Sequence, residues 1–298
     1  MKEKITDIGE LKRIATQVRR DILRMVHYVS SGHPGGSLSC TELLTALYFR
    51  VMDQSDDFDM TAKNQDAFFM SNGHISPVLY SVLARRGYFH LDELSSFRKL
   101  NSRLQGHPTT HEGLPGIRVS TGSLGQGLSV GVGMALAKKM DRDSGFVFVS
   151  TGDGELDEGQ IWEAALFAPH HKLDNLIVIV DWNGQQIDGP NDEILNLGDL
   201  EGKWRSFGWR VVVTDGNDME SIVRALEEGK THRGTEIPTV ILMRTVMGQG
   251  VDFMMGTNAW HGKAPNKEQL ERGLAQLEET LGDYVYDENY QSPQHKHA

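Results

Sequence analysis

Residues 146–159 read FVFVSTGDGELDEG, and residues 176–189 read LIVIVDWNGQQIDG. In each stretch a short, mostly apolar run leads directly into a loop that contains glycine, acidic and amide residues. Such a run, bounded by turn residues, is typical of a strand that is buried on both faces of a parallel sheet. Ligands bind at the carboxyl ends of the strands in sheets of this kind. We therefore expect the two loops to form the functional site.

The remaining chain alternates short apolar runs with helical stretches. Further strands are expected at residues 67–71, 210–213 and 239–243. Helices are expected at about residues 8–30, 41–51, 77–86, 125–140, 158–171 and 217–229. Ser31, Gly32 and Pro34 are expected to end the first helix. The alternation predicts an α/β fold: a three-layer, mostly parallel sheet with helices on both faces.

The length and composition are those of a globular, acidic protein. The chain has 298 residues, 30 of them Lys or Arg and 41 Asp or Glu, which gives a net charge of −11. An acidic chain without a basic run repels nucleic acids and anionic membrane surfaces, so neither is expected as a partner. A single domain is expected over residues 1–285, because no repeat or linker interrupts the pattern. Residues 286–298 are polar and are expected to fray.

Cysteine usage and apolar segments indicate the compartment. Cys40 is the only cysteine, which excludes an internal disulfide and a cysteine-based zinc site and fits a reducing compartment. Residues 1–13 carry charges where a secretory signal is apolar. The run at 176–180 is far shorter than the ~20 apolar residues that a membrane-spanning helix needs. We expect a cytoplasmic protein.

Two nucleotide-binding motifs are only partly matched. Gly229-Lys230-Thr231 has the end of a phosphate-binding loop, but Arg224 stands where that motif requires glycine. The glycines at 122–133 do not fit the dinucleotide pattern G-x-G-x-x-G. These glycines lead from a loop into a helix, where bare backbone can approach a ligand or a neighbouring helix closely.

Asp153 and Asn183 lie 30 residues apart, each shortly after one of the two buried runs. Their side-chain oxygens are hard ligands of the kind that Mg²⁺ takes, with room left for water and diphosphate oxygens. The glycines beside Asp153 let backbone N–H groups face an anion. Gly-Asp-Gly by itself is also a common turn, and the second loop is what favours a metal site over a turn alone.

The two loops together resemble the thiamine diphosphate motif, in which Gly-Asp-Gly precedes an asparagine at this spacing. The chain from about residue 10 to 275 is similar to the N-terminal, diphosphate-binding half of transketolase. The segments that carry the similarity are SGHPGGSLS (31–39), SNGHISPVLYSVLA (71–84), GHP (106–108), STGSLGQGLSVGVGMALA (120–137) and WHG (260–262). SGHPGG and WHG favour transketolase over deoxyxylulose-phosphate synthase and the α chain of 2-oxo-acid dehydrogenase, the other thiamine diphosphate enzymes considered.

The resemblance implies a cofactor and metal site residue by residue. The metal ion, Mg²⁺ or in its place Ca²⁺ or Mn²⁺, is held by the side chains of Asp153 and Asn183 and by the backbone carbonyl of Gln185. The implied cofactor contacts are Gly154 at the diphosphate, His74 and His261 near it, Gly122 and Leu124 along the cofactor, and Ile187 under its bent form.

The resemblance also implies residues for the chemistry. His33 and His107 face the sugar and, with His261, carry the proton transfers, which suits imidazole because its ordinary pKa of about 6.5 allows both uptake and release. Glu158 and Glu163 run along the subunit interface toward the partner's cofactor site, where Glu158 is the expected catalytic carboxylate and Glu163 a cofactor-site residue. A carboxylate that opposes a helix dipole is the alternative for Glu158.

The implied activity is transfer of a two-carbon ketol unit from a ketose phosphate to an aldose phosphate on thiamine diphosphate. No segment resembles the pyrimidine-binding domain or the C-terminal domain of transketolase. Because Met1 opens the chain and a polar tail closes it, we expect the N-terminal subunit of a split transketolase rather than a fragment. The expected partner is a C-terminal subunit with the pyrimidine-binding domain, in a dimer of heterodimers. A catalytically inert, regulatory relic of the fold is the non-enzymatic alternative, and the intact metal-site and histidine residues speak against it.

Overall fold

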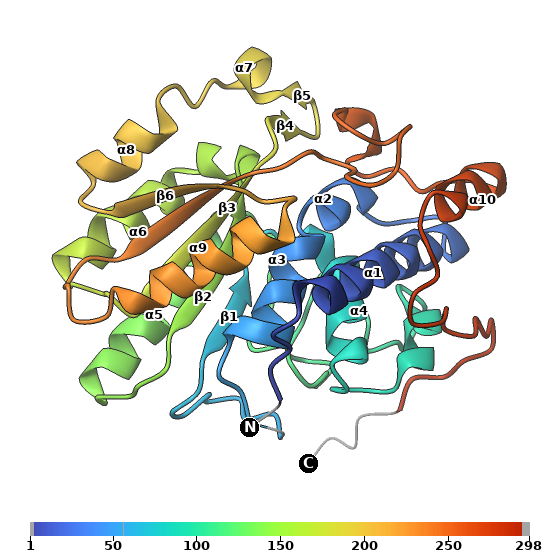
Figure 1. The fold of residues 1–298 in the computed structure, drawn as a ribbon, viewed down its shortest axis with the longest axis horizontal. Coiled ribbons are helices and arrows are strands. Elements are labelled where there is room, and N and C mark those ends of the chain that lie inside the picture. The colour runs from blue at the N-terminus through green and yellow to red at the C-terminus, as the bar shows by residue number, and fades with distance from the viewer. Residues whose placement is uncertain (1–2, 56, 294–298) are drawn as a thin grey trace.

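The structure is a computed structural model that describes residues 3–55 and 57–293. Within these residues, five parallel strands form one sheet in the order β1-β2-β3-β7-β6 (Figure 1). The strands are β1 Ala67–Met70, β2 Val147–Gly152, β3 Leu176–Trp182, β7 Thr239–Arg244 and β6 Arg210–Asp215. Each overlaps a run expected from the sequence. The parallel sheet confirms the predicted α/β fold.

The interior strands are buried on both faces because alternate side chains enter two separate cores. Leu176 and Val178 of β3 lie in one core, and Ile177 and Ile179 lie in the other. The first core is covered by α5 Gln126–Met140, α6 Gly159–His170 and α8 Leu200–Ser206. The second is covered by α1 Ile8–Tyr28, α3 Thr41–Ala46, α4 Ser76–Arg85 and α9 Met219–Thr231. This is the expected three-layer arrangement, with the sheet in the middle (Figure 1).

The first helix ends where the sequence predicts, but Pro34 has a different role. After Tyr28 the chain turns through left-handed backbone at Ser30, with φ 52°, and at Gly32, with φ 141°. Pro34 is then the first residue of α2 Pro34–Ser39, a position that suits its fixed φ and its missing N–H. Pro34 therefore begins a helix, with His33 at the N-cap. The predicted helix at 41–51 is α3 followed by a π-helical turn at Leu47–Val51.

Several short elements are not predicted by the sequence analysis. They are α7 Asn191–Ile194, α8, α10 Lys267–Ala275, the antiparallel pair β4 Gln185–Gln186 and β5 Gly189–Pro190, and 3-10 turns at Gly73–Ile75, Leu91–Ser96, Gly154–Asp157 and Asn258–Trp260. α10 begins with a capping box, in which the Asn266 side chain accepts from the N–H of Gln269 and the Gln269 side chain accepts from the N–H of Asn266, both at 2.9 Å. That signal is present in the sequence.

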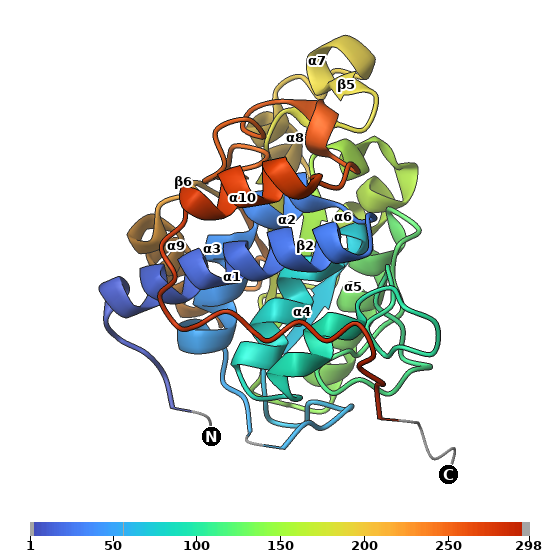
Figure 2. The same cartoon turned by 90° about the vertical axis from the view of Figure 1, so that its right-hand side faces the viewer.

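After α10, residues 276–293 run across α1 and α4 (Figure 2). Asp283 accepts hydrogen bonds at 2.7–3.0 Å from three side chains of α1: Gln17, Arg20 and Arg24. Tyr286 stacks on Tyr28 with the ring centroids 3.6 Å apart, and Ser292 Oγ lies 3.0 Å from Ser96 Oγ. The first part of the tail expected to fray thus lies against the domain. Residues 294–298 lie outside the described residues, and a domain boundary at 285 stays a prediction.

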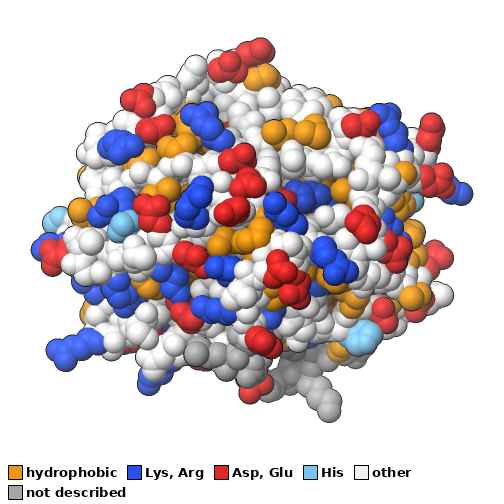
Figure 3. All heavy atoms as spheres, viewed as in Figure 1, with side chains coloured by type: hydrophobic (Ala, Val, Ile, Leu, Met, Phe, Trp, Pro, Cys, Tyr) orange, Lys and Arg blue, Asp and Glu red, His pale blue; other side chains and the backbone are white. Residues whose placement is uncertain are grey.

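The described surface mixes charges of both signs. Acidic and basic side chains are interspersed over the face in Figure 3, with apolar side chains between them. On α5 and α6, large apolar side chains are exposed: Val130, Met140, Leu166 and Phe167. No helix in the described part of the chain is both long and apolar enough to span a membrane.

Candidate active site

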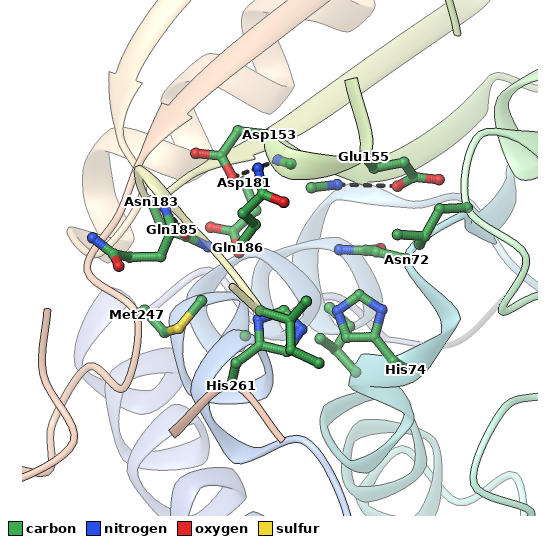
Figure 4. A pocket seen from close by; sticks show the side chains of 16 residues that line it. Asn72, His74, Asp153, Glu155, Asp181, Asn183, Gln185, Gln186, Met247 and His261 are labelled. Atoms are coloured by element: carbon green, nitrogen blue, oxygen red, sulfur yellow. Dashed lines mark hydrogen bonds between the residues drawn. The ribbon is translucent and has the colours of Figure 1, made fainter. Parts of the chain in front are cut away.

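The carboxyl ends of β2 and β3 open into a cavity, where the two loop motifs predict a site. The residues that line it are Gly36, Asn72, His74, Ile75, Leu124, Gly152, Asp153, Gly154, Glu155, Asp181, Asn183, Gln185, Gln186, Ile187, Met247 and His261. Figure 4 shows the carboxylate and amide side chains near β2 and β3 on one side and the two imidazoles on the other. The cavity therefore joins the loops after β1, β2, β3 and β7 with α2 and the loop before α5.

Asp153 is a buried carboxylate that pairs with no Lys or Arg in the described residues. It is 1% exposed, Oδ1 accepts from the N–H of Gly154 at 2.9 Å, and Oδ2 accepts from the N–H of Gly184 at 2.6 Å. Burial, together with the neighbouring Asp181, raises the pKa of Asp153 to about 7. Each carboxylate oxygen keeps a lone pair beyond these bonds. A divalent cation would stabilise the ionised form.

Asn183 is oriented by Asp181, a residue that the sequence analysis missed. Nδ2 of Asn183 donates to Oδ2 of Asp181 at 2.9 Å, and Oδ1 of Asn183 accepts from the N–H of Gln185 at 2.9 Å. Asp181 also accepts hydrogen bonds from the hydroxyls of Ser39, at 2.7 Å, and Thr245. The only sequence signal for it is an acidic residue directly after the apolar run LIVIV.

The four predicted histidines come together from four different segments. His33 lies at the N-cap of α2, His74 in the turn after β1, His107 in the loop before α5, and His261 directly after the Asn258–Trp260 turn. The ring centroid of His33 lies 5.1 Å from that of His74, 5.7 Å from that of His261 and 6.3 Å from that of His107. The rings of His74 and His261 are stacked at 5.1 Å.

Burial keeps these imidazoles neutral near pH 7. Burial lowers the pKa of His74 to about 3 and that of His33 to about 4, and it also lowers the pKa of His107 and His261. Neutral imidazole offers one N–H donor and one acceptor nitrogen. Nδ1 of His33 and Nδ1 of His261 are buried and have no hydrogen-bond partner in the described part of the chain. Such orphaned nitrogens fit a site that is completed by a ligand.

The loop before α5 needs glycine at two positions. Gly122 has φ 142°, and a Cβ there would lie 2.7 Å from Cδ2 of His107. Gly125 has φ 83°, and a Cβ there would lie 2.8 Å from Cβ of Glu158. Both positions are in the left-handed region that favours glycine. The loop can therefore lie close to His107 and bring Leu124 to the cavity.

Two later glycines in this segment serve packing against the sheet. A Cβ at Gly131 would lie 2.3 Å from Cγ2 of Val149 in β2, and one at Gly127 would lie 2.6 Å from Cα of Ser71. Gly133, in contrast, has nothing within 4 Å of such a Cβ. Of the two explanations offered for these glycines, close approach to another element holds for 127 and 131, where the element is β2 or the residue that follows β1 and not a second helix.

Glu158 and Glu163 lie outside the cavity. Both are exposed, and Glu158 stands at the N-cap of α6 without a side-chain capping bond. Glu163 lines a groove between α5 and α6. Within this chain neither carboxylate meets the histidine cluster, so a role for them at a neighbouring site stays a prediction. Ile187 and Gln185, on the short β4–β5 hairpin, do line the cavity.

The donor set fits thiamine diphosphate with a divalent ion. No group of three or more His, Cys, Asp or Glu side chains in the described residues is arranged to hold a metal. Asp153 and Asn183 would supply two ligands and the Gln185 carbonyl a third, and diphosphate oxygens and water would complete the shell. Mg²⁺ is commonly held in this way, through few side chains together with phosphate oxygens.

Comparison with known proteins places this chain in a family. Residues 11–294 match the family model described as transketolase, thiamine diphosphate binding domain. The chain is 42% identical over 269 residues to the 6-deoxy-6-sulfo-D-fructose transketolase subunit SqwG of Clostridium sp. (strain MSTE9). The aligned residues cover 90% of this chain and 96% of that protein. It is 39% identical over 263 residues to an apulose-4-phosphate transketolase subunit of Phocaeicola vulgatus, covering 88% of this chain and 92% of that protein.

Solved structures agree with this assignment. The transketolase of Campylobacter jejuni matches with a TM-score of 0.84 at 30% identity, over 91% of this chain and 43% of that chain. The chain thus spans less than half the length of this transketolase and nearly all of the two subunits. Fold and matched domain define a thiamine diphosphate-binding domain. The chain belongs to the transketolase family of transferases, as the resemblance predicts.

Proposed function

We propose that the chain is the diphosphate-binding subunit of a two-chain transketolase, which transfers a two-carbon ketol unit from a ketose phosphate to an aldose phosphate. The observation that carries this proposal is the buried Asp153, which shares one cavity with the neutral imidazoles of His74 and His261. Near-complete coverage of two proteins named as transketolase subunits supports it. The proposed cofactors are thiamine diphosphate and Mg²⁺.

The proposed metal ligands are the side chains of Asp153 and Asn183 and the backbone carbonyl of Gln185. A diphosphate on a chain of net charge −11 needs a local counter-charge, and the metal ion provides it. Gly154 is proposed to approach the diphosphate. Gly122, Leu124 and Ile187 are proposed to contact the rest of the cofactor, which agrees with the places of Leu124 and Ile187 in the cavity wall.

The histidines are proposed to divide the remaining work. When bound, thiamine diphosphate supplies the carbon nucleophile that carries the two-carbon unit. His74 and His261 would contact the diphosphate, and His33 and His107 would bind sugar hydroxyls. Because burial lowers the pKa of all four, each is uncharged at neutral pH and offers one acceptor nitrogen for a hydrogen bond from a hydroxyl. His33, His107 and His261 are the proposed proton carriers.

A second chain with the pyrimidine-binding domain is proposed to complete the enzyme. The chain spans 42% of the length of the human transketolase, to which it is 35% identical. The proposed contact face includes Glu158 and Glu163 and the exposed apolar side chains of α5 and α6. Glu158 would act at the partner's cofactor site. The working unit would hold two copies of each chain.

The substrates are proposed to be sugars with an anionic group, phosphate in the first instance. The two subunits compared above are named for 6-deoxy-6-sulfo-D-fructose and for apulose 4-phosphate. No Lys or Arg is among the described residues that line the cavity. We therefore assign recognition of the anionic end to the second chain.

Calorimetric titration with thiamine diphosphate, on the complex of this chain with the second chain, tests the site. We expect binding in the presence of Mg²⁺, loss of binding with EDTA, and loss of binding in Asp153→Ala. Asp192→Asn is the matched control, because it removes an exposed acidic charge from a neighbouring segment, α7. Wild-type affinity in Asp153→Ala would overturn the site assignment.

A further inference from the structure

Glu155 is a buried carboxylate that the proposed chemistry does not use. It is 2% exposed and lies in the 3-10 turn Gly154–Asp157, directly after β2 (Figure 4). Its Oε1 accepts hydrogen bonds from the hydroxyl of Ser71 and from the N–H of Gly125, the latter at 2.8 Å. Its Oε2 accepts from the N–H of Gly152 at 3.1 Å. One carboxylate thus connects three segments that are distant in the sequence.

Each of the three donors borders a part of the cavity. Ser71 directly precedes Asn72 and lies three residues before His74, both of which line the cavity after β1. Gly125 follows Leu124, and Gly152 precedes Asp153. The hydrogen bonds therefore fix the relative positions of a histidine, an apolar wall residue and the proposed metal ligand. No other described side chain bonds all three of these loops.

The chemistry of these bonds requires a carboxylate. Three donors converge on two oxygens, which together offer about four lone pairs. Glutamine in the same place has only one acceptor atom, and its amide nitrogen would face a donor. No Lys or Arg pairs with Glu155 in the part of the chain that the structure describes. The pKa of Glu155 is raised overall, because burial outweighs the lowering by the bonds from Ser71, Gly125 and Gly152.

Glu155 also occupies backbone donors near the N-terminus of α5. Gly125 is the N-cap of α5, so its N–H is one of the donors that would otherwise attract an anion to this helix end. Glu155 already accepts from that N–H and from the N–H of Gly152. Its negative charge lies beside the positive end of the α5 dipole.

We propose that Glu155 is a positioning residue, which holds the loops carrying His74, Leu124 and Asp153 at the spacing that cofactor binding needs. This inference rests on the proposed function, and it adds a residue that acts through its neighbours. The competing explanation is that Glu155 only stabilises the fold. The two explanations differ in which residues show faster amide hydrogen exchange after a substitution of Glu155.

Hydrogen exchange of the full chain without cofactor separates them. The variants are Glu155→Gln, which keeps shape and one acceptor, and Glu155→Ala, which removes both acceptors. We expect Glu155→Gln to raise amide exchange about tenfold at residues 122–126 and 152–154, the scale for losing a hydrogen bond to a charged group. Exchange in β3 and β7 should stay unchanged. Asp157→Asn, in the same turn, is the control, because among the described residues the carboxylate of Asp157 bonds only the side chain of Gln186.

Affinity for thiamine diphosphate with Mg²⁺ is the second readout. We expect about 10-fold weaker binding in Glu155→Gln and up to about 100-fold in Glu155→Ala, the range for residues that orient metal ligands. Asp157→Asn should bind as the wild type does. If Glu155→Ala does not fold, Glu155→Gln decides by itself.

Two outcomes would overturn the inference. One is wild-type exchange at both segments together with wild-type affinity in Glu155→Gln. The other is a rise in exchange that is equal throughout the chain, β3 and β7 included, which would make Glu155 a stability residue only. Failure of the wild-type chain to bind thiamine diphosphate with Mg²⁺ even after the second chain is added would instead overturn the proposed function, and the exchange measurement would still decide whether Glu155 holds the loops.

Discussion

The amide of Asn183 is held by the buried carboxylate of Asp181, with Nδ2 of Asn183 donating to Oδ2 of Asp181 over 2.9 Å. The nitrogen of the amide is thereby directed to Asp181, and its oxygen is left for the N–H of Gln185 and for a metal ion. Asp181 is fixed in turn by hydroxyl groups from α2 and from the segment after β7. The proposed metal site therefore depends on residues that do not touch the metal.

Substitution of Asp181 by asparagine tests this dependence. Asp181→Asn would place an amide nitrogen where hydroxyl and amide donors now converge, so Asn183 would lose its orientation. We expect Mg²⁺-dependent affinity for thiamine diphosphate to fall by about 10-fold to 100-fold. Calorimetry with Asp192→Asn as the control measures it. Unchanged affinity would show that Asn183 does not need Asp181 to bind the metal.

The histidines are expected to differ in what they contribute. His33→Ala and His107→Ala should leave cofactor affinity nearly intact and slow ketol transfer by ~10² or more, the usual scale for losing a positioned acid–base group. His74→Ala should weaken cofactor binding. Steady-state rates and cofactor titrations on the complex with the second chain measure both, with the exposed His90→Ala as the control. The opposite pattern would reverse the proposed roles.

Acid should destabilise the chain through its buried imidazoles. The pKa of His74 is lowered to about 3 and that of His33 to about 4, whereas an unfolded histidine titrates near about 6.5. The stability from burying neutral imidazole is fully present above pH 6.5 and is lost as the pH falls toward 4 and below.

Denaturant unfolding between pH 7 and pH 5 measures this effect. In His74→Gln the slope of the free energy of unfolding against pH should decrease by the amount that corresponds to roughly one bound proton. A wild-type slope in His74→Gln would show that His74 is not buried in its neutral form.

The glycines of α5 are expected to respond differently to alanine. Gly131→Ala would place a methyl group 2.3 Å from Cγ2 of Val149, so we expect a loss of about 1–3 kcal/mol in the free energy of unfolding. Gly133→Ala meets nothing within 4 Å and should gain about 0.5–1 kcal/mol from helix propensity. Thermal or denaturant unfolding of the isolated chain measures both. Equal effects would contradict the packing described for α5 on β2.

The isolated chain is expected to have no transketolase activity. The proposed site binds the diphosphate end of the cofactor, and the part of the enzyme that binds the pyrimidine end is assigned to a second chain. An assay with xylulose 5-phosphate, ribose 5-phosphate, Mg²⁺ and thiamine diphosphate measures turnover before and after the second chain is added. Robust turnover in a preparation free of any second polypeptide would contradict the two-chain proposal.

Much of the fold could be predicted because each interior strand appears in the sequence as one continuous apolar run. Residues 176–180 and 240–243 are apolar at every position, since β3 and β7 are covered by helices on both faces. Asp153 and Asn183 could be paired because β2 and β3 are adjacent parallel strands, with Gly152 in register with Asp181. The loops that follow them must therefore lie side by side.

The supporting residues of the site could not be predicted in this way. Asp181 bonds Ser39 across 142 residues of sequence, and Glu155 bonds Ser71 across 84. An acidic residue after an apolar run signals a buried charge, but only the folded chain brings its partners to it. The capping box of α10 and the helix-starting position of Pro34 were local signals that could have been recognised.

The contacts of Asp283 have a consequence for the order in which the protein acquires its structure. Gln17, Arg20 and Arg24 meet this one acceptor across 259–266 residues of sequence. A ribosome must deliver all of the intervening chain before those three side chains can reach their acceptor, and closing a loop of that length is slow compared with forming a helix. Helix α1 therefore completes its packing only after residue 283 has been synthesised.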